Sequence, residues 1–355
     1  LQGKTTIDVE ATGGQGTANS TYATAVGIKN KSSSALNVTG PLDIVTNATV
    51  VAAGAAEAEA KAAGIANFSG TTNIKDDVKI AASATGVSGN EFYAASVYGE
   101  GGTVNVGTDG SNSLGKIVQL EGDVLAKNNG TTININLDQA GSYLQGNVQE
   151  QTGGIVNLIV GNGATWRPVF DNRNGTYFDK NNNATFSKDY GQDTNSINSL
   201  TLNQDGNVDL VWDNATRSNS FRTLTIASLS GDGGIVKINS DLANNKADQI
   251  SLGNGSTTAS LNIDVKYDPY LATAGLVGGN NITGSALVVT GAGSSKLTTV
   301  NGVPDSYNTY DYVPTITKNV DGTYSLTKLA ITNAVPTPTP GGKTTITSPS
   351  VPMKE

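Results

Sequence analysis

Two residue types are absent from this chain of 355 residues, which has no cysteine and no histidine. Without cysteine, the chain has neither disulfides nor thiolate chemistry. A cysteine-free chain also fits bacterial export across an outer membrane, because a disulfide formed in the periplasm would hinder translocation. Without histidine, a Ser–His–Asp triad and imidazole-ligated metal sites are excluded.

Large apolar side chains and basic side chains are scarce as well. Hydrophobic residues make up 37% and aromatic residues 6% of the chain, which has 43 glycines. A compact globular core usually needs more large side chains than this. The net charge of −8 disfavours nucleic acids and anionic membranes as partners. No stretch approaches the roughly 20 apolar residues of a membrane-spanning helix.

The apolar residues that are present alternate with polar ones in short runs. In Thr131–Leu137, an isoleucine or leucine occupies every second position from Ile133, and asparagines lie between them. Gly154–Val160 and Ala259–Val265 alternate in the same way. One apolar and one polar face per strand fits a β-solenoid, whose coils stack around a narrow, dry interior. Disorder, the competing interpretation of so polar a chain, does not account for this alternation.

The stretch Phe221–Leu252 shows the repeating unit most clearly. Its apolar runs Leu224–Ile226, Ile235–Ile238 and Ile250–Leu252 are separated by Gly, Asn, Asp and Ser. The glycines of Gly231–Gly234 supply the positive-φ positions that a tight corner between strands needs. Strand-length runs parted by turn residues predict many short strands rather than helices.

This stretch resembles the C-terminal half of the passenger domain of pertactin-like autotransporters, which are secreted bacterial β-helices. The chain departs from the family pattern at Ala247, where glycine is usual, and at Ile235, where an aromatic residue often stands. The resemblance is strongest from about Asn198 to Asn333. The residues that carry it are Leu224-Thr225-Ile226, Leu229-Ser230-Gly231-Asp232-Gly233-Gly234, Asp241-Leu242 and Asp248-Gln249-Ile250.

The resemblance implies an all-β fold, a right-handed parallel β-helix with short loop or helical insertions and a C-terminal capping hairpin region. Residues 1–333 would form the passenger domain, with a folding and capping region at about 221–333. The hairpin is expected at Tyr307–Tyr312 and Asp321–Leu326. Coils of about 20 to 30 residues would give about 11 to 16 layers.

The two ends of the chain fit the same interpretation. Residues 334–355 are rich in Pro, Gly and Ser, which is typical of a linker, here one leading toward a translocator barrel that this sequence does not include. No signal peptide is visible at the first residues, so the sequence is expected to be a mature fragment.

Two segments are expected to be insertions. Ala52–Ala63 has the highest helix propensity in the chain, a possible Glu57–Lys61 pair and a stop signal at Gly64. It predicts a short helix that packs beside the β-helix or caps it, the alternative being a protrusion that meets a partner. The aromatic-rich run Glu91–Tyr98 predicts a second insertion.

Thr165–Gly191 is expected to be the longest interruption of the coils, with several aromatic residues among Asn and Asp. These aromatics either form a binding loop or pack on one another and on the body of the β-helix. The resemblance favours packing, because the pair Thr165-Trp166 is common inside the coils of similar passengers.

Sequence motifs for chemistry are few. The Gly-Asp-Ser-Gly and Gly-Asp-Ser-Leu runs of protease and lipase passengers do not occur, so polysaccharide-cleaving β-helices remain the enzyme alternative. Asp76-Asp77 predicts a solvated turn, and Asp171–Gly175 lacks the alternating ligands of a calcium loop. The sequence therefore assigns no catalytic, cofactor-binding or metal residues and no cofactor, and it leaves the binding residues unknown.

These features together predict a bacterial adhesin passenger, exported through the outer membrane and exposed at the cell surface. Polar ladders along the rod would mediate attachment, self-association or biofilm formation. The expected partner is a host-surface glycan, a matrix protein or another copy of the chain, not nucleic acid, and this fragment is not expected to insert into a membrane. The alternatives are a polysaccharide lyase or hydrolase and a trimer like a phage tail spike.

Overall fold

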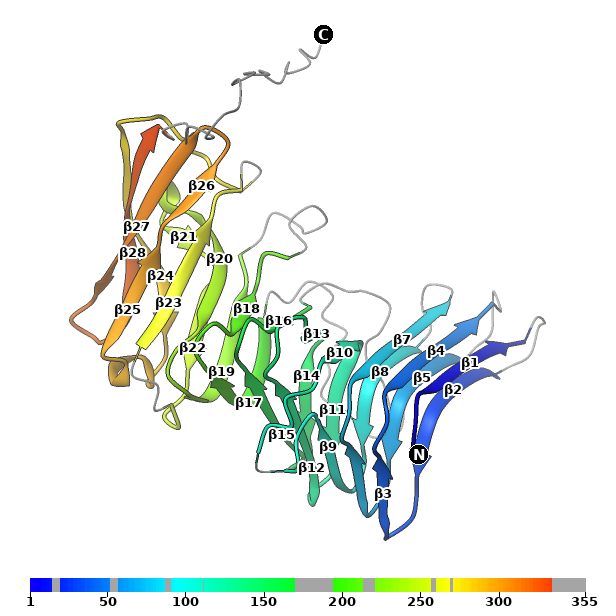
Figure 1. Cartoon of the computed structure of the whole chain (residues 1–355). Helices are drawn as coiled ribbons and strands as arrows, with labels where there is room; N and C mark the ends of the chain where they lie inside the picture. Colours follow the sequence, from blue (N-terminus) through cyan, green and yellow to red (C-terminus); the bar gives the residue numbers. More distant parts are fainter. Residues whose placement is uncertain are drawn as a thin grey trace, which may run out of the picture.

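A computed structural model describes residues 1–14, 20–51, 57–86, 91–110, 112–169, 194–212, 221–256, 260–268 and 271–333. Within these residues the chain consists of β-strands and two short 3-10 helices, η1 (Leu242–Asn244) and η2 (Ser294–Lys296). No helix there is long and apolar enough to cross a membrane. The strands stack one above another along the molecule and form three sheets (Figure 1).

Sheet A contains one strand from every coil and runs the length of the molecule. Its strands, in spatial order, are β1 (Thr5–Gly13), β4 (Leu42–Val50), β7 (Val78–Gly86), β10 (Val118–Glu121), β13 (Tyr143–Gln145), β16 (Thr165–Arg167), β18 (Asn207–Asp209), β20 (Ile235–Asp241), β23 (Ser260–Lys266) and β25 (Thr299–Val303). The short strand β21 (Lys246–Ala247) pairs with β20.

Sheet B lies only in the N-terminal part. Its strands are β2 (Ser20–Asn30), β5 (Glu57–Asn67), β8 (Glu91–Gly99), β11 (Asp123–Lys127) and β14 (Val148–Gln151).

Sheet C also runs the length of the molecule. Its strands begin with β3 (Ala35–Val38), β6 (Thr71–Ile74), β9 (Gly102–Val106), β12 (Thr131–Leu137), β15 (Ile155–Val160), β17 (Thr194–Leu202), β19 (Thr223–Ser230), β22 (Gln249–Leu252) and β24 (Asn281–Thr290). It ends with β28 (Tyr324–Asn333), β27 (Tyr310–Lys318) and β26 (Asp305–Tyr307).

The strand pairing is that of a parallel β-helix, as predicted. Successive coils pair in parallel from the first coil up to β22 and β24. Sheet A stacks ten strands in series within the described residues, fewer than the 11 to 16 layers expected. The reason is coil length: equivalent asparagines of sheet C lie 36 residues apart in the first coils and 23 apart in a later one.

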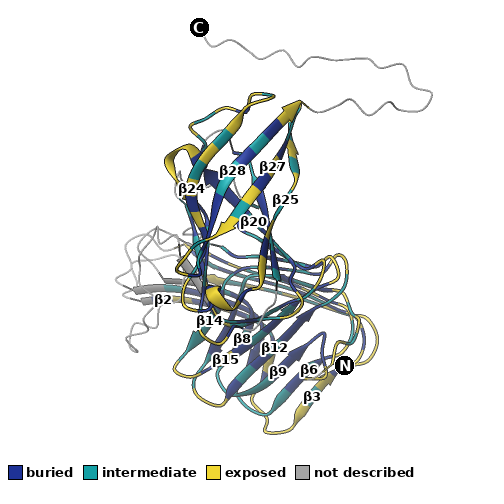
Figure 2. Ribbon diagram, turned by 90° about the vertical axis from the view of Figure 1, so that its left-hand side faces the viewer, coloured by how far each residue is buried: buried dark blue, intermediate teal, exposed yellow. Residues whose placement is uncertain are grey.

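The interior follows the predicted alternation. Ile133, Ile135 and Leu137 of β12 are almost completely buried, and so are Leu261 and Ile263 of β23. These side chains belong to one continuous core of Ile, Val, Leu and Ala that runs through the coils to the C-terminal strands. Figure 2 shows this core as dark blue strand faces, with the exposed yellow residues concentrated at turns and on the C-terminal strands. Each coil therefore buries a narrow apolar layer against its neighbours.

The predicted helix at Ala52–Ala63 is wrong, because strand β5 begins at Glu57; Ala52–Ala56 lie outside the described residues. Ala60 and Ala62 are fully buried in a small cluster with alanines of β2, β4 and β7. Here sheets A and B pack face to face through methyl groups, and we call this region the alanine sandwich. Burial between the two sheets outweighs the intrinsic preference of alanine for helices. In the strand, Lys61 forms an ion pair with Glu59, and the side chain of Glu57 lies outside the described residues.

The insertion predicted at Glu91–Tyr98 is also wrong, since these residues form the regular strand β8 beside β5. Gly64, expected to end a helix, lies in the middle of β5. A Cβ on Gly64 would lie 2.1 Å from Ile80 Cγ2 and 2.8 Å from the Ser96 carbonyl oxygen. Glycine is therefore required where the alanine sandwich meets the wider core.

The C-terminal end is antiparallel, as expected for the capping hairpin. β27 and β28 form a hairpin, and β28 pairs antiparallel with β24. Tyr324 is buried, and its hydroxyl donates a hydrogen bond of 2.8 Å to the Leu297 carbonyl oxygen. The linker predicted at 334–355 lies outside the described residues. Because these last strands run antiparallel, they cover the end of the β-helix and no further parallel coil can stack on it.

Sheet B forms the third side of the N-terminal coils, beside sheets A and C, and it ends at β14. In the later coils, buried side chains form hydrogen bonds with the backbone on this third side. Asp248, fully buried, accepts hydrogen bonds from the backbone N–H groups of Arg222 (2.8 Å) and Asn239 (2.7 Å). The Arg222 guanidinium donates to the Leu210 carbonyl oxygen at 2.7 Å. A carboxylate with two oxygens thus satisfies backbone donors that a sheet strand would otherwise pair.

Candidate interaction surface

An asparagine repeats at one register position on the outward face of sheet C in five successive coils. Strands β3, β6, β9, β12 and β15 supply it, and parallel pairing places each one directly beside the next. The five residues, which we call the asparagine ladder, are Asn37, Asn73, Asn105, Asn134 and Asn157.

The side-chain amides of the asparagine ladder are joined in a continuous chain. Each Nδ2 donates to the Oδ1 of the preceding coil, over distances of 2.9, 2.7, 2.8 and 2.8 Å from the N-terminal end. All four bonds run in the same direction, so the amide dipoles add and polarise one another. Asn37 is exposed, whereas Asn105 is 95% buried beneath the turn that contains Gly110. The ladder therefore fixes the outward face of sheet C and is itself only partly accessible.

A row of threonines lies beside the asparagine ladder. Thr71, Thr103 and Thr132 share one register position, two residues before the asparagine of each strand. All three side chains are partly exposed. Strand geometry separates the two rows by about 7 Å along the strands and successive coils by about 4.8 Å, which makes a flat polar array. We call this row and the ladder together the polar face.

A second set of polar pairs lies on the outward face of sheet A. The Ser83 hydroxyl donates to Asn47 Oδ1 at 2.6 Å, and the hydroxyls of Thr49 and Thr85 are 3.2 Å apart. These pairs lie on the alanine sandwich and are exposed. The outward polar residues thus pair between coils on two different sheets.

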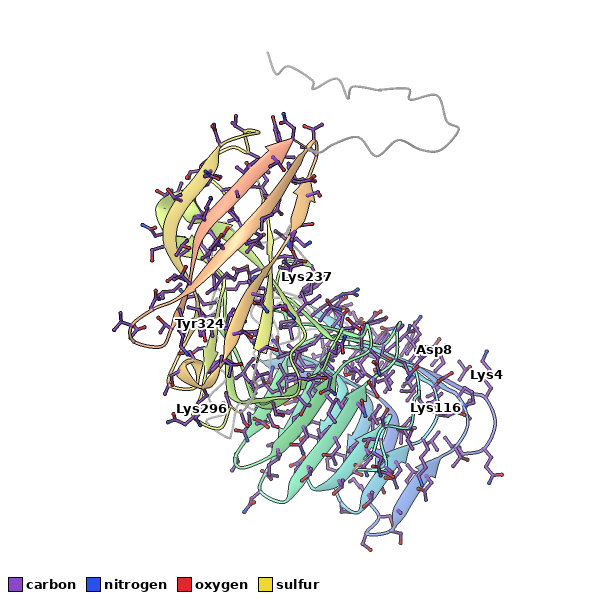
Figure 3. All side chains as sticks on the ribbon, turned by 60° about the vertical axis from the view of Figure 1, so that its left-hand side comes forward. Lys4, Asp8, Lys116, Lys237, Lys296 and Tyr324 are labelled. Atoms are coloured by element: carbon purple, nitrogen blue, oxygen red, sulfur yellow. The ribbon has the colours of Figure 1, made fainter. Side chains whose placement is uncertain are left out.

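A shallow groove crosses the starts of β1, β4, β7 and β10. Its charged lining residues are Lys4, Asp43, Asp77 and Lys79. Figure 3 shows Lys4 and Lys116 at this end of the N-terminal coils. The charges are mixed in sign, so the groove does not select a ligand by its electrostatic potential.

The solvated turn predicted at Asp76-Asp77 is present. Asp76 lies 2.6 Å from Lys116 Nζ, and this hydrogen bond lowers the pKa of the Asp76 carboxyl. The Ile117 backbone N–H donates to Asp77 Oδ1 at 2.9 Å. The two carboxylates therefore serve the turn between neighbouring coils. The segment Asp171–Gly175, considered as a calcium loop, lies outside the described residues.

Trp166 is completely buried, and its Nε1–H donates to the Gly146 carbonyl oxygen at 3.0 Å. This confirms that Thr165-Trp166 lies inside a coil. The other aromatics of the interruption lie outside the described residues, so their packing stays a prediction.

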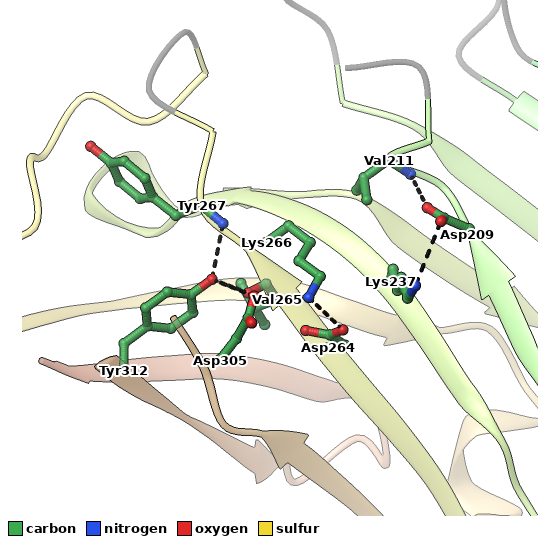
Figure 4. Close-up of polar contacts among 9 residues, drawn as sticks. All are labelled: Asp209, Val211, Lys237, Asp264, Val265, Lys266, Tyr267, Asp305 and Tyr312. Atoms are coloured by element: carbon green, nitrogen blue, oxygen red, sulfur yellow. Dashed lines mark hydrogen bonds and ion pairs between the residues drawn. The ribbon is translucent and has the colours of Figure 1, made fainter. Parts of the chain in front are cut away.

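Two acids near the C-terminal end have shifted pKa values of opposite sign (Figure 4). Burial raises the pKa of the Asp264 carboxyl. Burial acts the same way on Asp305, but hydrogen bonds, first from Lys266, lower its pKa overall. A pair of carboxyls with separated pKa values is the arrangement that glycoside hydrolases use, so these acids bear on the enzyme alternative.

The surroundings of these acids indicate a structural role. Lys266 Nζ lies between the two carboxylates, 2.8 Å from Asp264 Oδ2 and 2.8 Å from Asp305 Oδ2. The Tyr312 hydroxyl lies 2.9 Å from both the Val265 carbonyl oxygen and Asp305 Oδ2. The lysine links the two carboxylates, and the network joins strand β23 to the antiparallel strands β26 and β27. In the described parts of the chain, no three acidic residues are grouped to hold a metal ion.

Sequence reasoning missed a carboxyl at the start of strand β11 in sheet B. Asp123 Oδ1 accepts a hydrogen bond from the Asn147 backbone N–H (2.8 Å), and Oδ2 accepts one from Gln149 Nε2 (3.0 Å). Although the residue keeps some accessible surface, desolvation of its carboxyl raises the pKa of Asp123 to about 7. Only the register of the coils reveals it, because an aspartate at the start of a short strand is unremarkable in sequence.

Comparison with known proteins supports the resemblance. Residues 197–328 match the family model Pertactin. Residues 197–328 thus form a pertactin-like domain. No curated protein sequence matches it.

Among solved structures, the crystal structure of the Haemophilus influenzae Hap adhesin is similar, with 17% sequence identity and a TM-score of 0.39. The match covers 82% of this chain and 25% of the Hap chain, so the chain spans about a quarter of that protein's length.

Proposed function

We propose that this chain is the surface-exposed part of a bacterial adhesin and that the polar face is its contact surface. The pertactin-like domain at 197–328 supports export to the cell surface. The observation that carries the proposal is the register of the polar face, which repeats Thr-x-Asn in three successive strands, β6, β9 and β12.

Such a surface gains affinity by repetition. A single hydrogen bond exchanged with water contributes only about 0.5–1.5 kcal/mol. Because the polar face repeats the same groups at each coil, an extended partner can make many such bonds at once. A host glycan, a matrix protein and the polar face of another copy all present repeated donors and acceptors. Attachment and self-association are thus two uses of one surface.

The test displays the passenger at the surface of a non-adhesive bacterium and measures clumping and attachment to matrix-coated and glycan-coated surfaces. The double variant Thr71→Glu/Thr132→Glu places charge on the polar face and should abolish contact. The control Ser83→Glu/Thr85→Glu adds the same charge to the outward face of sheet A and should leave adhesion unchanged. Absence of clumping and attachment in the unmodified passenger would refute the proposal.

Two simple measurements decide the alternatives. Light scattering that reports a stable trimer would favour a protein of the tail-spike kind. Shortening of a polysaccharide, tested on a panel with and without calcium, would favour an enzyme. We expect neither.

A further inference from the structure

The corner between sheet B and sheet C gathers lysines around an aromatic ring. Lys29 Nζ lies 5.4 Å and Lys31 Nζ 5.5 Å from the centre of the Phe68 ring. The Phe68 ring packs edge-on against Tyr98 of the next coil, with 5.9 Å between their centres. These four residues come from three successive coils and form what we call the basic corner. Cation–π attraction holds the two ammonium groups near the ring.

The two lysines of the basic corner lack an anionic partner among the residues that the structure describes. Neither Lys29 nor Lys31 forms an ion pair there. The acid at this corner, Glu100, is engaged by the Tyr98 hydroxyl at 2.6 Å and approached by Lys127 Nζ at 3.9 Å. Two ammonium groups drawn to one ring repel each other, and a bound anion would relieve that repulsion. The site is positive on a chain whose net charge is −8.

Serine hydroxyls lie next to the lysines along the chain. Three serines, Ser32 to Ser34, follow Lys31 and are exposed. Ser69, directly after Phe68, donates its hydroxyl hydrogen bond to the Lys31 carbonyl oxygen at 2.8 Å. Hydroxyls beside the cations match a ligand that carries both anionic and hydroxyl groups.

The backbone beneath the basic corner is fixed. The amide side chains of Asn30 and Asn67 are buried and joined by a hydrogen bond of 3.0 Å. Asn30 Oδ1 also accepts the Ser32 backbone N–H at 3.0 Å, which sets the turn that presents the serines. The corner leads directly into β6, which starts at Thr71 of the polar face. Little ordering is therefore needed when a ligand binds.

We propose that the basic corner binds an acidic glycan. Lys29 and Lys31 would hold its carboxylate or sulfate groups, and Ser32–Ser34 would bond its hydroxyls. The assignment rests on the proposed adhesive function and names one ligand class for it. An acidic peptide would satisfy the lysines but lacks the dense hydroxyls that the serine turn matches.

The test measures binding of the purified full chain by calorimetry to four probes: heparin, hyaluronan, neutral dextran and polyglutamate. We expect binding to heparin or hyaluronan, with affinity falling as salt rises, and none to dextran. The variant Lys29→Gln/Lys31→Gln should weaken binding at least tenfold. The control Lys75→Gln/Lys246→Gln removes two exposed lysines elsewhere and should stay within twofold of the unmodified chain.

A second pair of variants tests the ring. Phe68→Leu should weaken glycan binding several-fold because the lysines lose their anchor, whereas Phe68→Tyr keeps an aromatic ring and should bind normally. Circular dichroism checks that each variant is folded.

The proposal is overturned if neither acidic glycan binds, if the two double lysine variants weaken glycan binding equally, or if polyglutamate binds as tightly as the glycans. If no glycan binds but bacteria that display the chain still clump, glycan binding by the basic corner is refuted and the proposed adhesive function is retained.

Discussion

The two ends of this β-helix close the third side of their coils by different means. In the N-terminal part, which we call the three-sheet part, sheet B supplies a third layer of backbone pairing. In the C-terminal part, which we call the two-sheet part, sheets A and C continue alone, and buried side chains such as Asp248 bond directly to backbone N–H groups. A strand of a third sheet requires only that apolar and polar residues alternate. Closing the third side of a coil with a side chain requires a particular residue at a particular position. The family model matches the second part, at 197–328, where such residues are required.

The largest effect is expected from Asp248→Ala. The substitution leaves the buried N–H groups of Arg222 and Asn239 without this acceptor, at a cost of about 3 kcal/mol or more of unfolding free energy. Urea unfolding followed by circular dichroism measures it. Asp248→Asn retains one acceptor oxygen and should cost less. Equal stability of Asp248→Ala and the unmodified chain would show that these bonds do not close the coils.

The matching substitution in the three-sheet part is Gly64→Val. Its side chain would collide with Ile80 and with the Ser96 carbonyl. Overpacking of this kind costs about 1–3 kcal/mol. Thr24→Val, at an exposed position of β2, is the control and should change stability by less than about 0.5 kcal/mol. The loss should appear as increased proteolysis of the N-terminal coils first, and a uniform loss over the whole chain would argue against separate closures.

The β-helix itself was predictable from the sequence, whereas the contrast between its two parts was not. The alternation of apolar and polar residues at Thr131–Leu137 identified the inward face of the strand. The run Asp248-Gln249-Ile250, which carries part of the family resemblance, includes the carboxylate that closes the coil. The alanine sandwich was not predictable, because Ala60 and Ala62 prefer a helix in isolation and only the facing sheet makes a strand favourable. The asparagine ladder was equally hidden, since its members lie 23 to 36 residues apart and coincide only after the coil lengths are known.

Asp123 predicts a pH dependence confined to the three-sheet part. The folded-state pKa of about 7 lies above the ordinary aspartate value of 3.8, so the folded chain binds this proton more strongly than the unfolded chain. Stability from this group is therefore full below about pH 4, falls between about pH 4 and 7 and is constant above. A decrease of about 1–3 kcal/mol is expected.

Asp123→Asn should remove the part of the pH dependence that this carboxyl contributes and be more stable than the unmodified chain at pH 8. Its amide can donate to Gln149 Oε1, which has no hydrogen-bond partner among the described residues, once the Gln149 amide is turned over. Thermal unfolding across pH 4 to 8 supplies the comparison. Parallel curves for the two proteins would contradict the assignment.

The smallest stability effect is expected from Asn134→Ala. The variant loses two bonds of the asparagine ladder, to Asn105 and from Asn157. Both bonds are partly solvated, so the loss should be about 1 kcal/mol. Asn198→Ala, an exposed residue of β17 outside the ladder, is the comparison in urea titrations and should change stability less.

The most direct test of the account compares two charged variants of the same outward face of sheet C, displayed at equal surface levels. Thr71→Glu/Thr132→Glu alters the three-sheet part, and Thr225→Glu/Ser251→Glu alters neighbouring coils of the two-sheet part. The measurement is cell clumping and attachment. The account predicts that the first variant abolishes adhesion and the second retains it. Loss of adhesion only in the second, or equally in both, would contradict it.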